Sequence, residues 1–180
     1  DAAEEMGVDV DVKYYYGGQF YGSDAITARM EGWYQDGTQV VFACGGGIYT
    51  SAVEAAEQYD GKVIGVDVDQ RPKIGDLCIT SAMKGLYPAT YDTLNDVIIN
   101  GNWANYVGKI ATLGLVSANP EENYVQIPTA STQFEDGKFT QADYEALVAA
   151  MFAGDVTVSN DITAMPAVTN VTVEDFGNLK

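Results

Sequence analysis

Histidine is absent from this 180-residue chain, and basic residues are scarce. Without histidine the chain cannot form a Ser-His-Asp or Cys-His triad, and it lacks the commonest general base and metal ligand. Lysine and arginine together number 9 against 26 acidic residues, which gives a formal net charge of −17. Because so negative a surface repels phosphate backbones, we expect neither a nucleic acid nor an anionic membrane as a partner.

Cysteine is nearly absent as well, and long apolar runs are missing. Cys44 and Cys78 lie in apolar, strand-like surroundings and outside any CxxC motif, so the pattern supports neither a metal site nor redox chemistry. Two interpretations remain open: two small buried hydrophobic residues, which we favour, or one disulfide between neighbouring strands of an exported protein. No apolar run approaches the roughly 18 residues that a membrane helix needs. The sequence therefore predicts no metal, no cofactor and no spanning helix.

Residues 1–82 alternate between strand and helix patterns. With 47% hydrophobic and 19% charged residues, the chain has the composition of a folded globular protein. Its glycine-containing connections are short, and this alternation predicts an α/β fold with a doubly wound parallel sheet. Residues 1–7 resemble the end of a helix. We expect strands at 8–16, 39–44, 62–66 and 77–82, and helices from Ser23 or Asp24 to about 35 and at 50–59.

Residues 83–180 are less regular and are expected to complete the lobe or lobes built on the β-α-β core of residues 1–82. Thr140 is a strong N-cap for a helix through residue 152, closed by Gly154. The Thr- and Val-rich tail can hold one more strand. We also expect a helix at 86–100, a hairpin of 111–116 with 124–127 and a short strand at 156–158.

An apolar run that ends in carboxylates marks residues 63–70, VIGVDVDQ. A buried parallel strand would carry Asp67 and Asp69 to its carboxyl end, where open α/β sheets bind ligands. The next apolar strand ends at Lys84. An anion and a cation at strand ends suit a polar, uncharged ligand such as a sugar. From the residues alone, ligand binding and a structural role in capping or a salt bridge are equally good interpretations, and catalysis ranks below both.

A glycine loop and several aromatic residues are further candidates for the site. Gly45-Gly46-Gly47 lets backbone N–H groups approach a ligand, but neither GxxxxGK[ST] nor a clear GxGxxG is present, and tight packing explains the loop equally well. Phe42 directly precedes this loop and can stack on a planar ring. Of the aromatic residues in 14–21, strand alternation should place half in the core and leave the others free to face a cleft.

Together these motifs resemble the basic membrane protein family, whose best-defined members are PnrA-like purine nucleoside receptors. VIGVDVDQ at 63–70 matches the family's VIGVDxDQ signature, and ITSAMK at 79–84 matches its LTSxxK pattern. The strand ending at Phe42 is similar to one that leads into an AGG[ST]G-type loop, although the closing glycine is missing here. Helix patterns at 92–100 and 146–158 extend the resemblance over most of the chain.

The resemblance implies one lobe of a type I periplasmic-binding fold, in which two lobes close on a ligand. It further implies a non-catalytic, extracytoplasmic lipoprotein that delivers a purine nucleoside to the permease of an ABC importer. The chain is similar to the C-terminal part of such a receptor, so we expect a soluble piece whose N-terminal lobe lies outside it. By the resemblance, Phe42 stacks on the base, Asp67 accepts the ribose hydroxyls, Lys84 donates to the sugar, and Gly46 completes the ligand-binding set.

Three alternative interpretations remain. The first is a receptor for a sugar or another small polar solute. The second is an enzyme of doubly wound fold that uses Asp67 or Asp69 as an acid or base, and the third is a sensor module built on the same fold. The lack of histidine and of any nucleophile motif counts against the enzyme. We therefore expect a binding protein in which Asp67 holds the ligand and Asp69 is structural.

Overall fold

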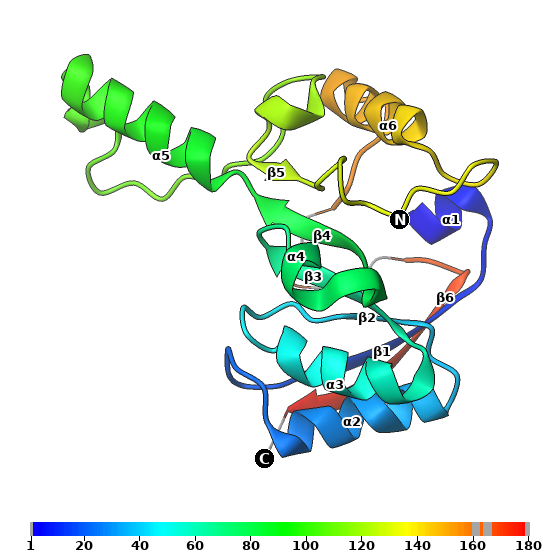
Figure 1. The fold of residues 1–180 in the computed structure, drawn as a ribbon. Helices are drawn as coiled ribbons and strands as arrows, with labels where there is room; N and C mark the ends of the chain where they lie inside the picture. The colour runs from blue at the N-terminus through cyan, green and yellow to red at the C-terminus, as the bar shows by residue number, and fades with distance from the viewer. Residues whose placement is uncertain (1, 160–162, 164–166, 179–180) are drawn as a thin grey trace.

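A computed structural model describes residues 2–159, 163 and 167–178 (Figure 1). Its first part contains α1 (Ala2–Met6), β1 (Val10–Tyr16), α2 (Asp24–Gln35), β2 (Val40–Phe42), α3 (Tyr49–Tyr59), β3 (Lys62–Asp67), α4 (Arg71–Ile74), the 3-10 turn η1 (Gly75–Leu77) and β4 (Cys78–Lys84). Its second part contains α5 (Leu86–Leu94), the π-helical turn η2 (Asn95–Ile99), η3 (Trp103–Asn105), η4 (Pro120–Glu122), β5 (Val125–Gln126), α6 (Gln141–Ala153) and β6 (Val171–Asn178).

Two sheets organise the described residues, and parallel pairing dominates both. In the larger sheet the order is β2-β3-β4-β5, with β2, β3 and β4 parallel and the two-residue β5 antiparallel at the edge. In the smaller sheet β1 pairs in parallel with β6, so the first and the last strand of the described chain lie side by side. The mixed α/β architecture with parallel strands confirms the predicted α/β class and agrees with the single periplasmic-binding lobe that the family resemblance implies.

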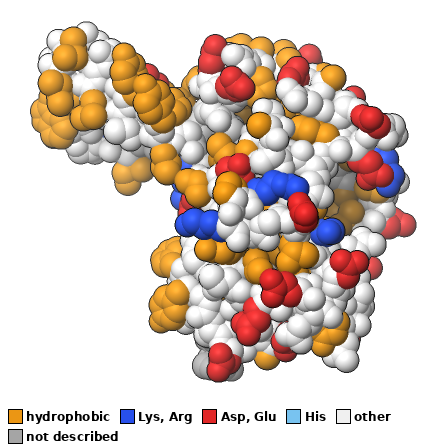
Figure 2. Space-filling view, viewed as in Figure 1, with side chains coloured by type: hydrophobic (Ala, Val, Ile, Leu, Met, Phe, Trp, Pro, Cys, Tyr) orange, Lys and Arg blue, Asp and Glu red, His pale blue; other side chains and the backbone are white. Residues whose placement is uncertain are grey.

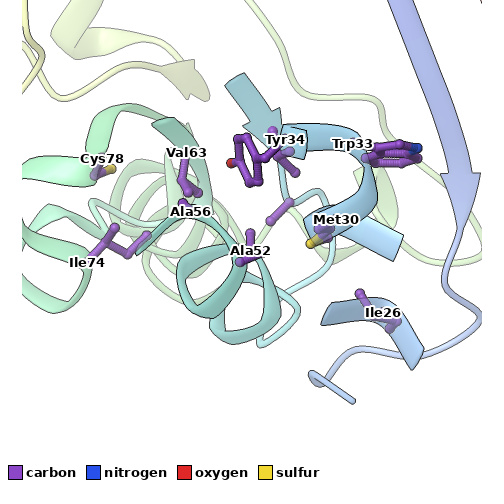
Figure 3. Packing of buried hydrophobic residues seen from close by; sticks show 12 residues of the cluster. Ile26, Met30, Trp33, Tyr34, Ala52, Ala56, Val63, Ile74 and Cys78 are labelled. Atoms are coloured by element: carbon purple, nitrogen blue, oxygen red, sulfur yellow. The ribbon is translucent and has the colours of Figure 1, made fainter. Parts of the chain in front are cut away.

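The core lies where α2 and α3 pack together and against the larger sheet (Figure 3). On α2, buried side chains recur at Ile26, Met30, Trp33 and Tyr34, the spacing of one helical face. On α3 the buried positions at 52, 55 and 56 are all alanine, and such small side chains allow the backbone of α3 to approach its neighbours closely. This packing holds α2 and α3, the helices that follow β1 and β2, and so helps to position the carboxyl ends of those two strands.

The two cysteines are both free thiols, and they differ in burial. Cys78 is fully buried at the start of β4, as predicted. The prediction of burial is wrong for Cys44, which is exposed. The reason is that β2 ends at Phe42, and Cys44 lies in the turn beyond it, where its N–H donates to the Phe42 carbonyl at 3.0 Å.

The predicted hairpin of residues 111–116 with 124–127 is wrong. Residues 111–116 form no strand, and β5 pairs instead with the end of β4, where Lys84 lies opposite Val125. The buried side chain of Asn123 explains the difference, because its Oδ1 accepts the N–H groups of Val116 and Ser117 at 2.7 and 2.9 Å. One backbone bond joins the two segments, from the Tyr124 N–H to the Gly114 carbonyl at 3.1 Å, and these side-chain bonds stand where the rest of a hairpin ladder would be.

The termini of α6 agree with the sequence, whereas part of the tail does not. Thr140 and Asp143 form a capping box at the start of α6, and Gly154 ends the helix in the left-handed conformation. The predicted strand at 156–158 is absent from those residues, while the strand expected further along the tail is β6.

The helix α5 projects from the body of the molecule (Figure 1), and apolar side chains cover much of this projection (Figure 2).

Tyr34 makes one buried contact between α2 and the larger sheet that can be tested for its effect on stability. Its hydroxyl donates to the Lys62 carbonyl at 2.6 Å, and burial raises the pKa of the phenol. We expect Tyr34→Phe to lower the free energy of unfolding by about 1 kcal/mol, because the carbonyl loses its partner. Urea denaturation measures the loss, with Tyr59→Phe at an exposed ring as the control. Equal stability of both variants would contradict this assignment.

Candidate functional site

Asp67 and Lys84 meet at the carboxyl ends of two neighbouring parallel strands. The register of β3 and β4 places Asp67 beside Met83, so Lys84 follows one residue later on the adjacent strand. Lys84 Nζ lies 2.7 Å from Asp67 Oδ1, the distance of a strong charge-assisted bond. The structure thus brings together the two residues of opposite charge that the sequence places at strand ends.

This ion pair is accessible from outside. The side chain of Lys84 is 66% exposed and that of Asp67 is 34% exposed. The hydrogen bond from Asp67, together with its negative charge, raises the pKa of Lys84, so the lysine stays charged at neutral pH. A solvent-facing pair of this kind adds little to folding stability, which leaves both groups available to an incoming polar ligand.

The backbone turns sharply at Asp67, and this turn separates the two carboxylates of the VDVD segment. Asp67 has a φ of 69°, in the left-handed region that few residues other than glycine, asparagine and aspartate adopt. Strand alternation therefore stops at Asp67. Asp69 points to a different set of partners: its Oδ1 accepts the Arg71 N–H at 3.0 Å, and its Oδ2 accepts the Ser131 hydroxyl at 2.7 Å. Asp69 has a structural role, joining the start of α4 to the segment around Ser131.

The glycine loop lies after β2, the strand next to β3, and packs against the segment that follows β1. The Gly47 N–H donates to the Phe20 carbonyl at 2.7 Å, and a Cβ on Gly47 would lie 2.9 Å from the same oxygen. Glycine is therefore needed at this position for the close approach of the two segments. The contact leaves the rings of Phe20 and Tyr21 strongly exposed beside the loop.

The aromatic candidates divide between core and surface. Tyr15 packs edge-on against Trp33, with ring centroids 6.5 Å apart, whereas Tyr14 and Tyr16 on the opposite face of β1 are exposed. Phe42 ends β2 with a half-exposed ring. Cys44 lies between Phe42 and the glycine loop. Because β2 and β3 are parallel neighbours, the glycine-loop end of β2 lies at the same end of the sheet as Asp67.

We call the surface formed by Phe42, Gly46, Asp67 and Lys84 the ligand edge. It lies at the end of the sheet where β2, β3 and β4 terminate, and none of its residues lines either of two hollows in the described surface. One hollow of about 390 Å³ is lined by residues of β1, α2 and β6, and the other, of about 330 Å³, by residues 118–121, 129, 141 and 145. No group of three His, Cys, Asp or Glu residues in the described ranges is placed to hold a metal ion.

A family model described as "ABC transporter substrate-binding protein PnrA-like" matches residues 3–157, most of the 180-residue chain. The chain belongs to this family. Membership assigns the PnrA-like chain to the extracytoplasmic substrate-binding proteins of ABC transporters. It implies a small-molecule ligand and a transporter permease as partner, and it supports a binding role in place of catalysis. A search of curated proteins finds no match. Within the described residues, no helix is both long enough and apolar enough to cross a bilayer.

Two residues of the site were missed by sequence reasoning. Gln70 and Ser81 are buried beneath the ligand edge and hydrogen-bonded to each other. Both belong to the quoted motifs, Gln70 as the last residue of VIGVDVDQ and Ser81 as the serine of ITSAMK. For Ser81 the signal that could have found it is a polar residue within a strand, because a buried polar group requires a partner. Gln70 lies beyond the end of β3 and carries no such signal.

The coupling between Asp67 and Lys84 gives a direct electrostatic prediction. We expect Asp67→Asn to lower the pKa of Lys84 toward its ordinary value, because the variant loses the negative charge and the strong acceptor. NMR titration of the isotopically labelled Cε and Nζ atoms of lysine measures the change. Asp76→Asn, which removes the carboxylate paired with Arg71, is the matched control and should leave Lys84 unchanged. An unchanged Lys84 titration in Asp67→Asn would contradict the ion pair.

Proposed function

We propose that this PnrA-like chain binds a purine nucleoside, with Asp67 and Lys84 holding the ribose. The observation that carries the proposal is the accessible ion pair at the end of two parallel strands, with an Nζ–Oδ1 distance of 2.7 Å. An ionised carboxylate accepts several hydrogen bonds and can take both vicinal hydroxyls of a ribose. The ammonium group has three donors, of which Asp67 occupies one, so it can also donate to the sugar.

The energetics of the ligand edge suit a neutral, polar ligand. Each charge-assisted bond contributes about 1.5–3 kcal/mol, so the sugar contacts supply a substantial share of a micromolar affinity, which is about 8 kcal/mol. The formal net charge of −17 disfavours a phosphorylated ligand, which distinguishes a nucleoside from a nucleotide.

The aromatic ring of Phe42 supports a base over a simple sugar. Its half-exposed side chain is free to stack on a planar ring, and such a contact contributes about 1–3 kcal/mol. Gly46 has a φ of 53°, and a Cβ built on it would meet only atoms of Phe20, at 3.5 and 3.9 Å. We propose that the Gly46 backbone lies against the base while Phe42 stacks on its face.

The openness of the ligand edge supports a second lobe in the complete receptor. Ligand sites usually bury most of the ligand surface, and a single exposed edge does not. We propose that an opposing N-terminal lobe closes on the nucleoside by a hinge motion, in a lipoprotein that delivers it to the permease. On this proposal the chain alone should bind weakly, in the millimolar range, because half of the contacts are missing.

Calorimetric titration of the two-lobed receptor tests the ligand assignment. We expect inosine, guanosine and adenosine to bind and Lys84→Ala to weaken binding by at least about tenfold, the loss of one charge-assisted bond. Lys73→Ala, at an exposed lysine on α4, is the matched control and should bind normally. Cytidine and free ribose complete the panel. Tight binding of ribose with no response to nucleosides would favour a sugar receptor, and turnover of a nucleoside would favour an enzyme.

Cys44 offers an independent test of where the ligand lies. It is exposed just beyond the carboxyl end of β2, the strand next to β3, whereas Cys78 is buried and should not react. In a receptor whose cysteines outside this chain are removed, we expect saturating nucleoside to slow alkylation of Cys44 at least about fivefold, because the occupied, closed site restricts access. Mass spectrometry of the alkylated peptide measures the rate, and Cys44→Ala is the blank. Alkylation that is equally fast with and without bound nucleoside would place the ligand elsewhere.

A further inference from the structure

Gln70 is a buried residue whose side chain makes two hydrogen bonds, to β3 and to the glycine loop, and whose backbone N–H makes a third, to β4. It is only 5% exposed, although it directly follows the surface turn at Asp69. A buried amide must have partners, and here each polar group of the residue has one. Its Oε1 accepts the Val66 N–H at 3.1 Å, its Nε2 donates to the Gly46 carbonyl at 3.4 Å, and its own N–H donates to Ser81 Oγ at 3.1 Å.

The partners of Gln70 lie beside the residues proposed to hold the ligand. Val66 directly precedes Asp67 in β3, and Gly46 belongs to the loop that follows Phe42. Ser81 is fully buried in β4, the strand that ends at Lys84. The side chain and backbone of Gln70 thus connect the loop after β2, the end of β3 and the middle of β4.

The space for this amide depends on a glycine in the neighbouring strand position. Gly65 pairs with Ser81, and a Cβ on Gly65 would lie 2.6 Å from Ser81 Oγ and 2.8 Å from Gln70 Oε1. Such distances are too short for any side chain, so glycine at 65 is what allows the Gln70 amide to enter the sheet. The Gln70 carboxamide therefore occupies a fitted space and not a chance position at the surface.

We propose that Gln70 is a positioning residue that sets the geometry of the ligand edge. By holding the Val66 N–H it fixes the backbone immediately before the left-handed turn at Asp67, and so the direction of the carboxylate. By holding the Gly46 carbonyl it sets the distance between the glycine loop and β3. The consequence for ligand affinity rests on the proposed function, whereas the effect on the loop and the turn does not.

Two substitutions distinguish the side-chain bond of Gln70 to Val66 from its bond to Gly46. Gln70→Met has nearly the same length but makes neither side-chain bond, so we expect faster hydrogen exchange at Val66 and Gly47 and at least tenfold weaker nucleoside binding. Gln70→Glu keeps an acceptor for Val66 but cannot donate to Gly46 when ionised. We therefore expect it to preserve protection at Val66, to increase exchange at Gly47, and to bind with an affinity between those of Gln70→Met and the unaltered protein.

Tyr34→Phe is the matched control, because it also removes a buried hydrogen bond but acts at Lys62, the opposite end of β3. Exchange is measured by NMR on the chain and affinity by calorimetry on the two-lobed receptor. Equal losses of affinity in Gln70→Met and Tyr34→Phe, or unchanged exchange at Val66 and Gly47 in Gln70→Met, would overturn the positioning role. If the unaltered receptor binds no nucleoside, the proposed function fails, and the exchange pattern alone decides the role of Gln70.

Discussion

The parallel pairing of β3 with β4 is the contact on which the candidate site depends. Its register sets Gly65 beside Ser81 and Asp67 beside Met83, which brings Lys84 within reach of the Asp67 carboxylate. Because side chains alternate along a strand, a slip of one residue would turn Lys84 to the other face of the sheet. The buried bonds of Gln70 add a third strand to this arrangement, since they join the loop after β2 to the same edge.

The net charge of the molecule and the local charges of the ligand edge favour the same kind of ligand. The net charge of −17 makes the surface as a whole unfavourable to anions, while the ligand edge presents one carboxylate and one ammonium group close together. Such a pair can satisfy both the donors and the acceptors of a neutral sugar. Because the pKa of Lys84 is raised, its charge is lost only in strongly alkaline solution, so the edge should keep this character throughout the physiological range.

Much of the fold could be predicted from sequence because the decisive signals are local. Apolar runs ending in charged residues identify β3 and β4, and Thr140 with Gly154 identifies both ends of α6. What could not be predicted depends on side chains that take over backbone bonds. Asn123 prevents the expected hairpin, and Gln70 occupies the space that Gly65 leaves, yet in the sequence each is an ordinary polar residue. Family membership supplies the class of function, whereas the roles of Phe42, Gly46, Asp67 and Lys84 remain predictions.

The structure of the two-lobed receptor bound to a purine nucleoside tests the account most directly. We expect both ribose hydroxyls within hydrogen-bond distance of the Asp67 carboxylate, the Lys84 ammonium group bonded to the sugar, and the base stacked on Phe42. A nucleoside bound between the lobes with its ribose directed away from Asp67 and Lys84 would contradict the account.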